Sequence, residues 1–186
     1  MTESKPHLLN RLYLFLADRP IVVVTLAATA LLLVLHLRIE QQITGESLGT
    51  IYLQLSFTKS NFEAVLASWK SAGIARYLET LWIDYFLALC TALLLSSSAA
   101  HFQERHASAS PDRSQFIFML VPFAYMIFEF IENSLHIYIL MGRHFSNPVI
   151  MTSSIISFIK LVCFSISIGW MMRCYRNFRS SQKKSE

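Results

Sequence analysis

The hydrophobic residues of this chain gather into four long runs, and polar or charged segments separate one run from the next. Each run is about as long as the roughly 20 residues that an α-helix needs to cross a bilayer. A helix suits that environment because it satisfies its backbone polar groups internally. The pattern predicts four membrane-spanning helices, at about residues 20–38, 78–100, 115–141 and 149–172.

The connection between the first two runs is long and begins with a strand-like pattern. Apolar and polar side chains alternate over residues 51–57. Alternation with a period of two favours an extended backbone. We therefore expect an extended segment here.

A helix start follows in the same connection. Ser60 and Glu63 have the spacing of a capping box, and apolar residues at helical spacing come after them. Gly73 stands where such a helix is expected to end. The pattern predicts a short amphipathic helix over residues 61–72 on the membrane surface, with Trp69 at the level of the lipid headgroups.

The two ends of the chain are more polar than the runs. Leucine and phenylalanine residues within 8–16 would cover one side of a helix, which is typical of a helix in the membrane interface. The alternative is that this segment simply begins the first spanning helix. Residues 173–186 form a basic tail, which we expect to be frayed.

The composition agrees with a membrane protein. Of 186 residues, 54% are hydrophobic and 15% are charged, a balance that a soluble domain rarely tolerates. The net charge of +4 lies mostly at the ends, beside apolar runs, so we expect anionic lipids rather than nucleic acid as the partner. The three cysteines are far apart in the sequence and are expected to be small buried residues.

The distribution of basic residues predicts an orientation. The N-terminal segment, the loop after residue 100 and the tail carry a basic excess, whereas acidic residues offset the cations of the first long connection. By the positive-inside rule, both termini should be cytoplasmic. The amphipathic helix should then lie outside, in a multi-pass protein of a bacterial inner membrane.

The third run contains the most informative polar residues of the chain. Glu129, Glu132, Asn133 and His136 fall within an arc of roughly 100° on one face of a helix. Ionisable groups at membrane depth are expensive, so they should turn inward and meet partners.

The neighbouring runs supply candidate partners. Asp84 lies in the second run and Lys160 near the middle of the fourth, at depths that the predicted topology places in the outer half of the membrane with Glu132. We take as ligand- or proton-binding candidates Asp84, Glu129, Glu132, Asn133, His136 and Lys160. Secondary candidates on the same faces are Tyr77, Thr80, Thr91, Ser153 and Ser157.

The charges of this candidate site do not balance. Asp84, Glu129 and Glu132 are three acids against one base, Lys160. Two uncompensated negative charges in a low dielectric would be too costly to persist. Either some carboxyl groups stay protonated or a cation binds, and His136 could add a further positive charge or a metal-ligand nitrogen.

Metal and haem chemistry have weak support in the sequence. Glu132 and His136 stand four residues apart and could share one metal ion, but this spacing is generic. His36 and His136 should lie at similar depth and could hold a b-type haem. No nucleophile motif is present. We predict no cofactor and no catalytic residue, with a metal or haem enzyme left open as an alternative.

Three short motifs carry a resemblance. Trp82-Ile83-Asp84-Tyr85-Phe86, the Glu132-Asn133 pair and the mid-helix Lys160 resemble a group of uncharacterised bacterial four-helix membrane proteins. Residues 56–77 are similar too. The resemblance implies the same four-helix fold and the same polar site over about residues 45–165, and it implies no activity.

The chain departs from that group at a few positions. Glu129 stands where the group tends to have aspartate, and Ala88 and Leu89 stand where an aromatic residue or a proline is common.

We therefore expect an all-α, polytopic membrane protein that forms one domain over residues 1–186: a four-helix transmembrane bundle with a short amphipathic helix in the first external loop. Its expected function is proton- or cation-linked binding or transport of a small molecule or lipid. The alternative is a non-catalytic assembly or accessory subunit in which the buried charges are structural. A homodimer or another membrane protein is the expected protein partner, since the chain is small for a carrier and shows no inverted repeat.

Overall fold

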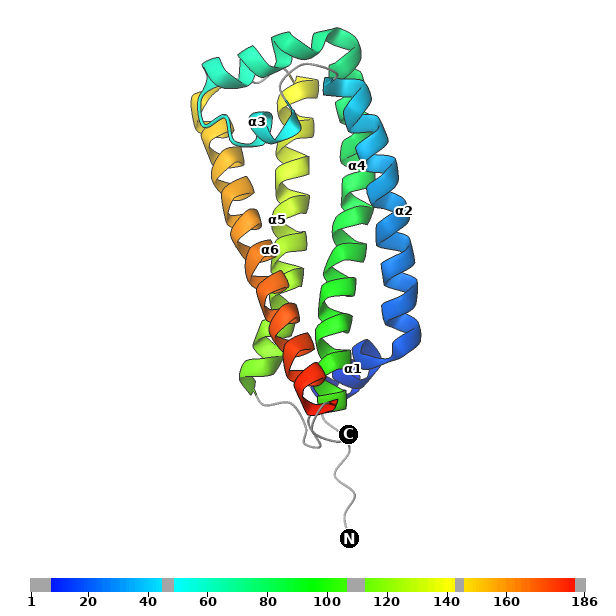
Figure 1. The fold of residues 1–186 in the computed structure, drawn as a ribbon. Coiled ribbons are helices and arrows are strands. Elements are labelled where there is room, and N and C mark those ends of the chain that lie inside the picture. The colour runs from blue at the N-terminus through cyan, green and yellow to red at the C-terminus, as the bar shows by residue number, and fades with distance from the viewer. Residues whose placement is uncertain (1–7, 45–48, 107–112, 143–145, 183–186) are drawn as a thin grey trace.

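The computed structural model describes residues 8–44, 49–106, 113–142 and 146–182, and these residues form helices without strands. Most of the polypeptide lies in long helices that run side by side (Figure 1). In chain order the elements are α1 (Leu8–Ala17), α2 (Arg19–Thr44), α3 (Thr50–Gln54), α4 (Lys59–His106), α5 (Arg113–Gly142) and α6 (Asn147–Gln182).

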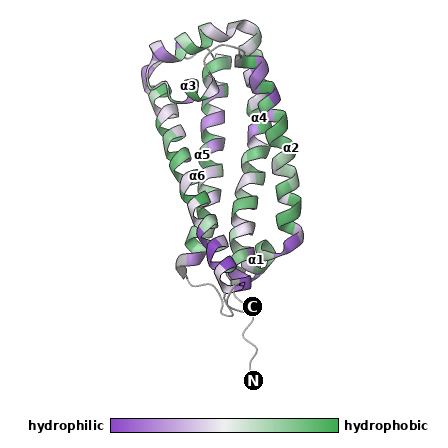
Figure 2. Ribbon diagram, in the orientation of Figure 1, coloured by the Kyte–Doolittle hydropathy of each residue, from purple (hydrophilic) through white to green (hydrophobic). Residues whose placement is uncertain are grey.

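Four of these helices are long and apolar enough to cross a membrane, as the hydrophobic runs predicted. The candidate spans are Arg19–Ile43, Ser71–Arg105, Gln115–Gly142 and Asn147–Gln182. Figure 2 shows hydrophobic residues along the shafts of the helices and hydrophilic residues gathered toward the two ends of the bundle. Many large apolar side chains face outward, including Val24, Leu31 and Met141, which suits contact with acyl chains.

The four spans contribute unequally to the interior. Helices α4, α5 and α6 all pack on one another, whereas α2 packs mainly along α4. In the most apolar window of α2, 6% of the residues are buried, against 33% for α4. The site therefore forms around α4, α5 and α6, with α2 as one side wall.

Helix α4 is bent, and this bend overturns one prediction. Its N-terminal part crosses the end of the bundle before the helix turns and runs down through it (Figure 1). Gly73, predicted to end a separate surface helix, instead lies within α4. A Cβ atom at Gly73 would lie 2.8 Å from the Cβ of Trp69, so only glycine permits so close an approach inside the bend.

The part of α4 before the bend also differs from expectation in its orientation. Trp69 is 4% exposed and packs against Tyr77, with ring centroids 5.2 Å apart, so it faces the bundle rather than the lipid headgroups.

The N-terminal cap of α4 also differs from the prediction. Thr58 accepts a hydrogen bond from the Asn61 backbone at 3.3 Å, so the capping residue lies two positions before the predicted Ser60 cap and the helix begins at Lys59.

The extended segment predicted over residues 51–57 is wrong. Residues Thr50–Gln54 form the short helix α3, which is tucked beneath the crossing part of α4 (Figure 1). No strand lies beside it among the described residues to pair with an extended backbone, and a helical turn satisfies part of that backbone locally. Phe57, in the turn that follows, adopts a left-handed backbone with φ of 55°, and its N–H donates to Ser154 Oγ.

The predictions for the two ends have mixed outcomes. Helix α1 exists, and it packs beneath α4 with Tyr13, Leu16 and Ala17 buried. The tail predicted to fray, residues 173–186, is helical as far as Gln182, where α6 ends, and residues 183–186 lie outside the described residues.

Apolar clusters close both ends of the bundle. The first, under the crossing part of α4, includes Leu53, Phe62, Ile139 and Ile150, each 1% exposed or less. The second joins α1 to the lower ends of α4 and α5. Between the two clusters lies the layer that contains most of the predicted polar residues.

Candidate functional site

A lysine between two glutamates forms the centre of the site. The Nζ atom of Lys160 on α6 lies 2.5 Å from Oε2 of Glu132 and 3.1 Å from Oε2 of Glu129, both on α5. The three residues are buried, with Glu132 at 0% exposure. Glu129 and Glu132 are three residues apart, so they share one face of α5 and both reach the same ammonium group. This places two carboxyl groups against one cation.

A second acid–base chain lies on the other side of the site. His36 Nδ1 on α2 is 2.6 Å from Asp84 Oδ1 on α4, and His36 Nε2 is 3.7 Å from Glu40. Thr50 of α3 donates a hydrogen bond of 2.6 Å to Glu40. Polar contacts thus connect α3, α2 and α4 in sequence. The imidazole again lies between two carboxyl groups.

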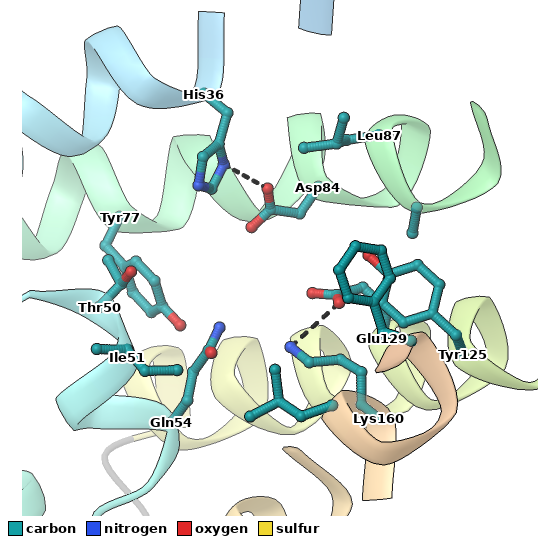
Figure 3. A pocket seen from close by; sticks show the side chains of 13 residues that line it. His36, Thr50, Ile51, Gln54, Tyr77, Asp84, Leu87, Tyr125, Glu129 and Lys160 are labelled. Atoms are coloured by element: carbon teal, nitrogen blue, oxygen red, sulfur yellow. Dashed lines mark ion pairs between the residues drawn. The ribbon is translucent and has the colours of Figure 1, made fainter. Parts of the chain in front are cut away.

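A cavity of about 250 Å³ separates these two groups. His36 and Asp84 lie on one side of it, and Glu129 and Lys160 on the other (Figure 3). Helix α3 contributes Gln54, whose side chain points into the cavity between Tyr77 and Lys160 (Figure 3). The lining comprises polar and apolar side chains of five helices: His36, Thr50, Ile51, Gln54, Tyr77, Asp84, Leu87, Ala88, Tyr125, Glu129, Lys160, Leu161 and Phe164.

A polar layer continues from the cavity between α5 and α6. Tyr77 Oη lies 2.6 Å from His136 Nδ1, and the other ring nitrogen of His136 is buried without a protein partner. Both side-chain polar atoms of Asn133 and the hydroxyl of Ser153 are likewise unpaired and buried. Such groups are costly to bury unless something satisfies them. Buried polar side chains are therefore present behind the cavity wall as well as in it.

The six residues predicted to bind a ligand or a proton lie either at the wall of the cavity or in the polar layer beside it. Asp84, Glu129 and Lys160 line the cavity. Glu132, Asn133 and His136 are 0% exposed; Glu132 contacts Lys160, and the other two lie in the layer beside it.

The secondary candidates of the sequence analysis are less closely connected with the cavity. Tyr77 lines the cavity, and Ser157 is buried, with its hydroxyl bonded to its own helix at Ser153. Thr80 is buried and donates to the Arg76 carbonyl, so it satisfies itself within α4. Thr91 is half-buried and does not line the cavity.

Sequence reasoning missed three side chains of the site. His36 was considered only for haem, although its position near the end of an apolar run opposite an acidic helix could have suggested an ion pair. Tyr125, whose hydroxyl is within hydrogen-bonding reach of Glu129, is one turn before it on α5. Gln54 lay in the segment taken as extended, so no signal placed it near Lys160.

The geometry also bears on metals and haem. Within the described residues, no three His, Cys, Asp or Glu side chains gather as a group that could hold a metal ion. The predicted Glu132 and His136 pair has no third ligand of these types there. His36 and His136 each contact another side chain through Nδ1, namely Asp84 and Tyr77.

No known family matches the chain, and no curated protein or solved structure is significantly similar to it. The resemblance to four-helix bacterial membrane proteins therefore rests on its short motifs alone.

The two glutamates and Lys160 form a group that can bind one further positive charge. With Lys160 charged, Glu129 and Glu132 together bring one negative charge more than the ammonium compensates. A low-dielectric interior disfavours that excess. Either a proton on one carboxyl group or a cation bound in the cavity neutralises the excess negative charge. A proton and a cation therefore compete to neutralise the same carboxylate.

Proposed function

We propose that this protein is a multi-pass membrane protein whose cavity binds a small, positively charged organic molecule, and that binding is linked to a proton on the glutamate pair. The observation that carries the proposal is the pairing of one lysine with two glutamates at the wall of a cavity. The ligand class is a small ammonium ion, either free or as the headgroup of a lipid.

The second acid–base pair supports this ligand class. Asp84 faces the cavity opposite Glu129, and its partner His36 also contacts Glu40. Acidic groups therefore exceed basic groups on both sides. A cation between them would gain electrostatic stabilisation in a medium of low dielectric.

The size and lining of the cavity support a small ligand. About 250 Å³ corresponds to roughly eight water molecules at bulk density. Tyr125 and Phe164 contribute aromatic rings beside the charged groups, and their centroids are 5.2 Å apart. Aromatic faces attract ammonium ions in addition to carboxylates.

The roof of the cavity, helix α3, indicates which face of the membrane the cavity is nearer. Helix α3 lines the cavity beneath the crossing part of α4, at the end of the bundle opposite α1 (Figure 1). With cytoplasmic termini, as the basic residues favour, this end faces outward in a bacterial inner membrane. The cavity would then lie nearer the external side.

The proposal is tested by measuring ligand stabilisation at several pH values. Full-length protein in nanodiscs is titrated with methylammonium, ethylammonium and tetramethylammonium chloride while its thermal unfolding midpoint is followed, with sodium chloride to match ionic strength. We expect at least one ammonium ion to raise the midpoint, and to do so at lower concentration as pH rises, because fewer protons compete. Absence of stabilisation at every pH contradicts the proposal.

A cavity-filling variant is the matched control. Ala88 is 1% exposed and lines the cavity without belonging to either acid–base group. Ala88→Leu should abolish the ammonium effect while both ion pairs stay intact. If the stabilisation persists in this variant, the ions bind elsewhere.

A structural role is the second candidate, and one observation favours it. Lys160 joins α6 to α5, and His36 joins α2 to α4, so each group cross-links two helices. An accessory subunit held together in this way would need no ligand. It predicts that no ammonium ion stabilises the protein and that Ala88→Leu changes only its packing.

A further inference from the structure

A second, smaller cavity lies at the opposite end of the bundle. Its volume is about 100 Å³, and it lies where the C-terminal end of α4, the start of α5 and the last turns of α6 meet. Neither acid–base group of the larger cavity contributes to it. Phe102, Gln103, Trp170, Arg173 and Asn177 are among the residues that line it.

Two side chains of this lining, Trp170 and Arg173, have hydrogen-bond donors and no acceptor. The indole Nε1 of Trp170 is buried and has no protein partner. An indole N–H can only donate. Arg173 lies beside it, with the guanidinium carbon 5.6 Å from the centroid of the indole ring, so its planar donors are close to the same cavity. These two donors favour an acceptor that carries negative charge.

Stacking fixes the orientation of the indole. Trp170 stacks on Phe118 of α5, with centroids 4.4 Å apart and planes inclined by 14°. Arg173 approaches the ring of Trp170, so the indole has an aromatic neighbour on α5 and a cation nearby. An oriented donor costs less conformational entropy when it meets a ligand.

Gln103 adds an independent observation. Its side chain is 8% exposed, its Nε2 donates to Cys174 Sγ at 3.3 Å, and its Oε1 is buried without a partner. An amide oxygen can only accept a hydrogen bond, so a headgroup held here by Trp170 and Arg173 would also offer a hydroxyl donor to Gln103.

The surroundings are basic, as an anion site requires. Arg176 and Arg179 follow on α6, and Arg105 lies near the end of α4, while Glu104 is an acid at the same end. This is the end of the bundle at which α1 and the last turns of α6 lie (Figure 1). Tryptophan and arginine are typical of the depth at which lipid phosphates lie.

We propose that this cavity binds the phosphate of an anionic phospholipid headgroup, with Trp170 and Arg173 as the donors. A volume of about 100 Å³ admits a phosphate-sized group but not a large ligand. The acyl chains would lie along the apolar outer surfaces of the helices. The site is independent of the ammonium-binding cavity, so either proposal can fail without the other.

Native mass spectrometry of the full chain in neutral detergent tests the site. Short-chain phosphatidylglycerol, phosphatidylcholine and inorganic phosphate are added separately, and bound molecules and the unfolding midpoint are recorded. We expect phosphatidylglycerol to be retained and to raise the midpoint. Trp170→Phe, which keeps the ring but removes the donor, and Gln103→Glu, which adds a negative charge, should each reduce the population with one bound lipid at least threefold.

The control is Arg179→Gln, which removes a tail cation that does not line the cavity. It should retain the bound lipid, whereas Arg173→Gln should lose it. An equal loss in both arginine variants would show attraction by the tail as a whole and would overturn the site. Equal retention of phosphatidylcholine, or equal stabilisation by phosphate alone, would overturn the choice of an anionic lipid.

Discussion

Lys160 of α6 and Glu132 of α5 form an ion pair with 2.5 Å between Nζ and Oε2, and neither side chain is more than 5% exposed. Glu129 contacts the same ammonium group. A buried cation with two buried acids has little access to bulk water, so its neighbours determine its charge state. The first prediction follows from this relationship.

Replacing Lys160 should strongly destabilise the protein. Lys160→Met leaves two buried carboxyl groups without their cation, and breaking a buried pair in this way costs about 3–5 kcal/mol. The free energy of unfolding in a mixed detergent series measures the loss. Lys59→Met is the matched control, because Lys59 forms an exposed pair with Glu63 at 3.6 Å, which contributes less than about 1 kcal/mol. Equal losses in the two variants would argue against a buried pair.

The bend of α4 should depend on Gly73. A Cβ atom there would approach the Cβ of Trp69 to 2.8 Å, so Gly73→Ala must open the bend and shift the roof over the cavity. We expect a loss of about 1–3 kcal/mol, typical of overpacking. Gly169→Ala is the control, because nothing lies within 4 Å of its added Cβ; it should be neutral or stabilise α6 by up to about 1 kcal/mol. A stabilised Gly73→Ala variant would mean that α4 is not tightly bent there.

Stability at alkaline pH should depend on Tyr13, which lies outside the four spans. Burial beneath α4, reinforced by Glu104, raises the pKa of the Tyr13 phenol from 10.0 to about 12. The folded protein therefore holds this proton more tightly than the unfolded chain. Its contribution is fully present below pH 10 and is lost as pH rises through about 12.

Tyr13→Phe checks that prediction. The variant removes the hydrogen bond to the Ala100 carbonyl and should lower stability slightly at neutral pH. It should also flatten the decline of the unfolding midpoint between pH 10 and 12. Equal slopes in the two proteins would show that folding does not raise the pKa of Tyr13.

The proposed orientation can be measured with single cysteines. Ser60 at the start of α4 and Ser180 near the end of α6 are both exposed. These two helix ends lie at opposite ends of the bundle (Figure 1). In a background without the three native cysteines, Ser60→Cys should react with a membrane-impermeant maleimide in intact bacteria. Ser180→Cys should react only after the cells are opened. The reverse pattern would invert the topology and place the roof of the cavity in the cytoplasm.

The sequence predicted the spans and the polar residues for one physical reason. Long apolar runs form long helices, and a charge isolated within such a run, such as Lys160 in α6, turns toward the interior that the helices share. The roof was predicted poorly because tertiary contacts decide it. Gly73 reads as a helix stop in isolation, but here it lets α4 bend around Trp69.

The composition of the site was harder to predict than its existence. His36 and Tyr125 each have an acidic residue four positions further along their own helix, Glu40 and Glu129, and this spacing is visible in the sequence. The contact of His36 with Asp84 depends instead on the packing of α2 against α4. Gln54 enters through a helical turn that the alternating pattern of residues 51–57 concealed.

Competition between a proton and an ammonium ion is the central claim, and proton release measures it most directly. Protein in weakly buffered nanodiscs is titrated with the best ammonium ligand while a pH-indicator dye follows released protons, with Glu129→Gln and Glu132→Gln as comparisons. The account predicts that the wild-type protein releases up to about one proton per bound ion and that both variants release fewer. Binding of the ion without proton release at any pH from 5 to about 9 would contradict it.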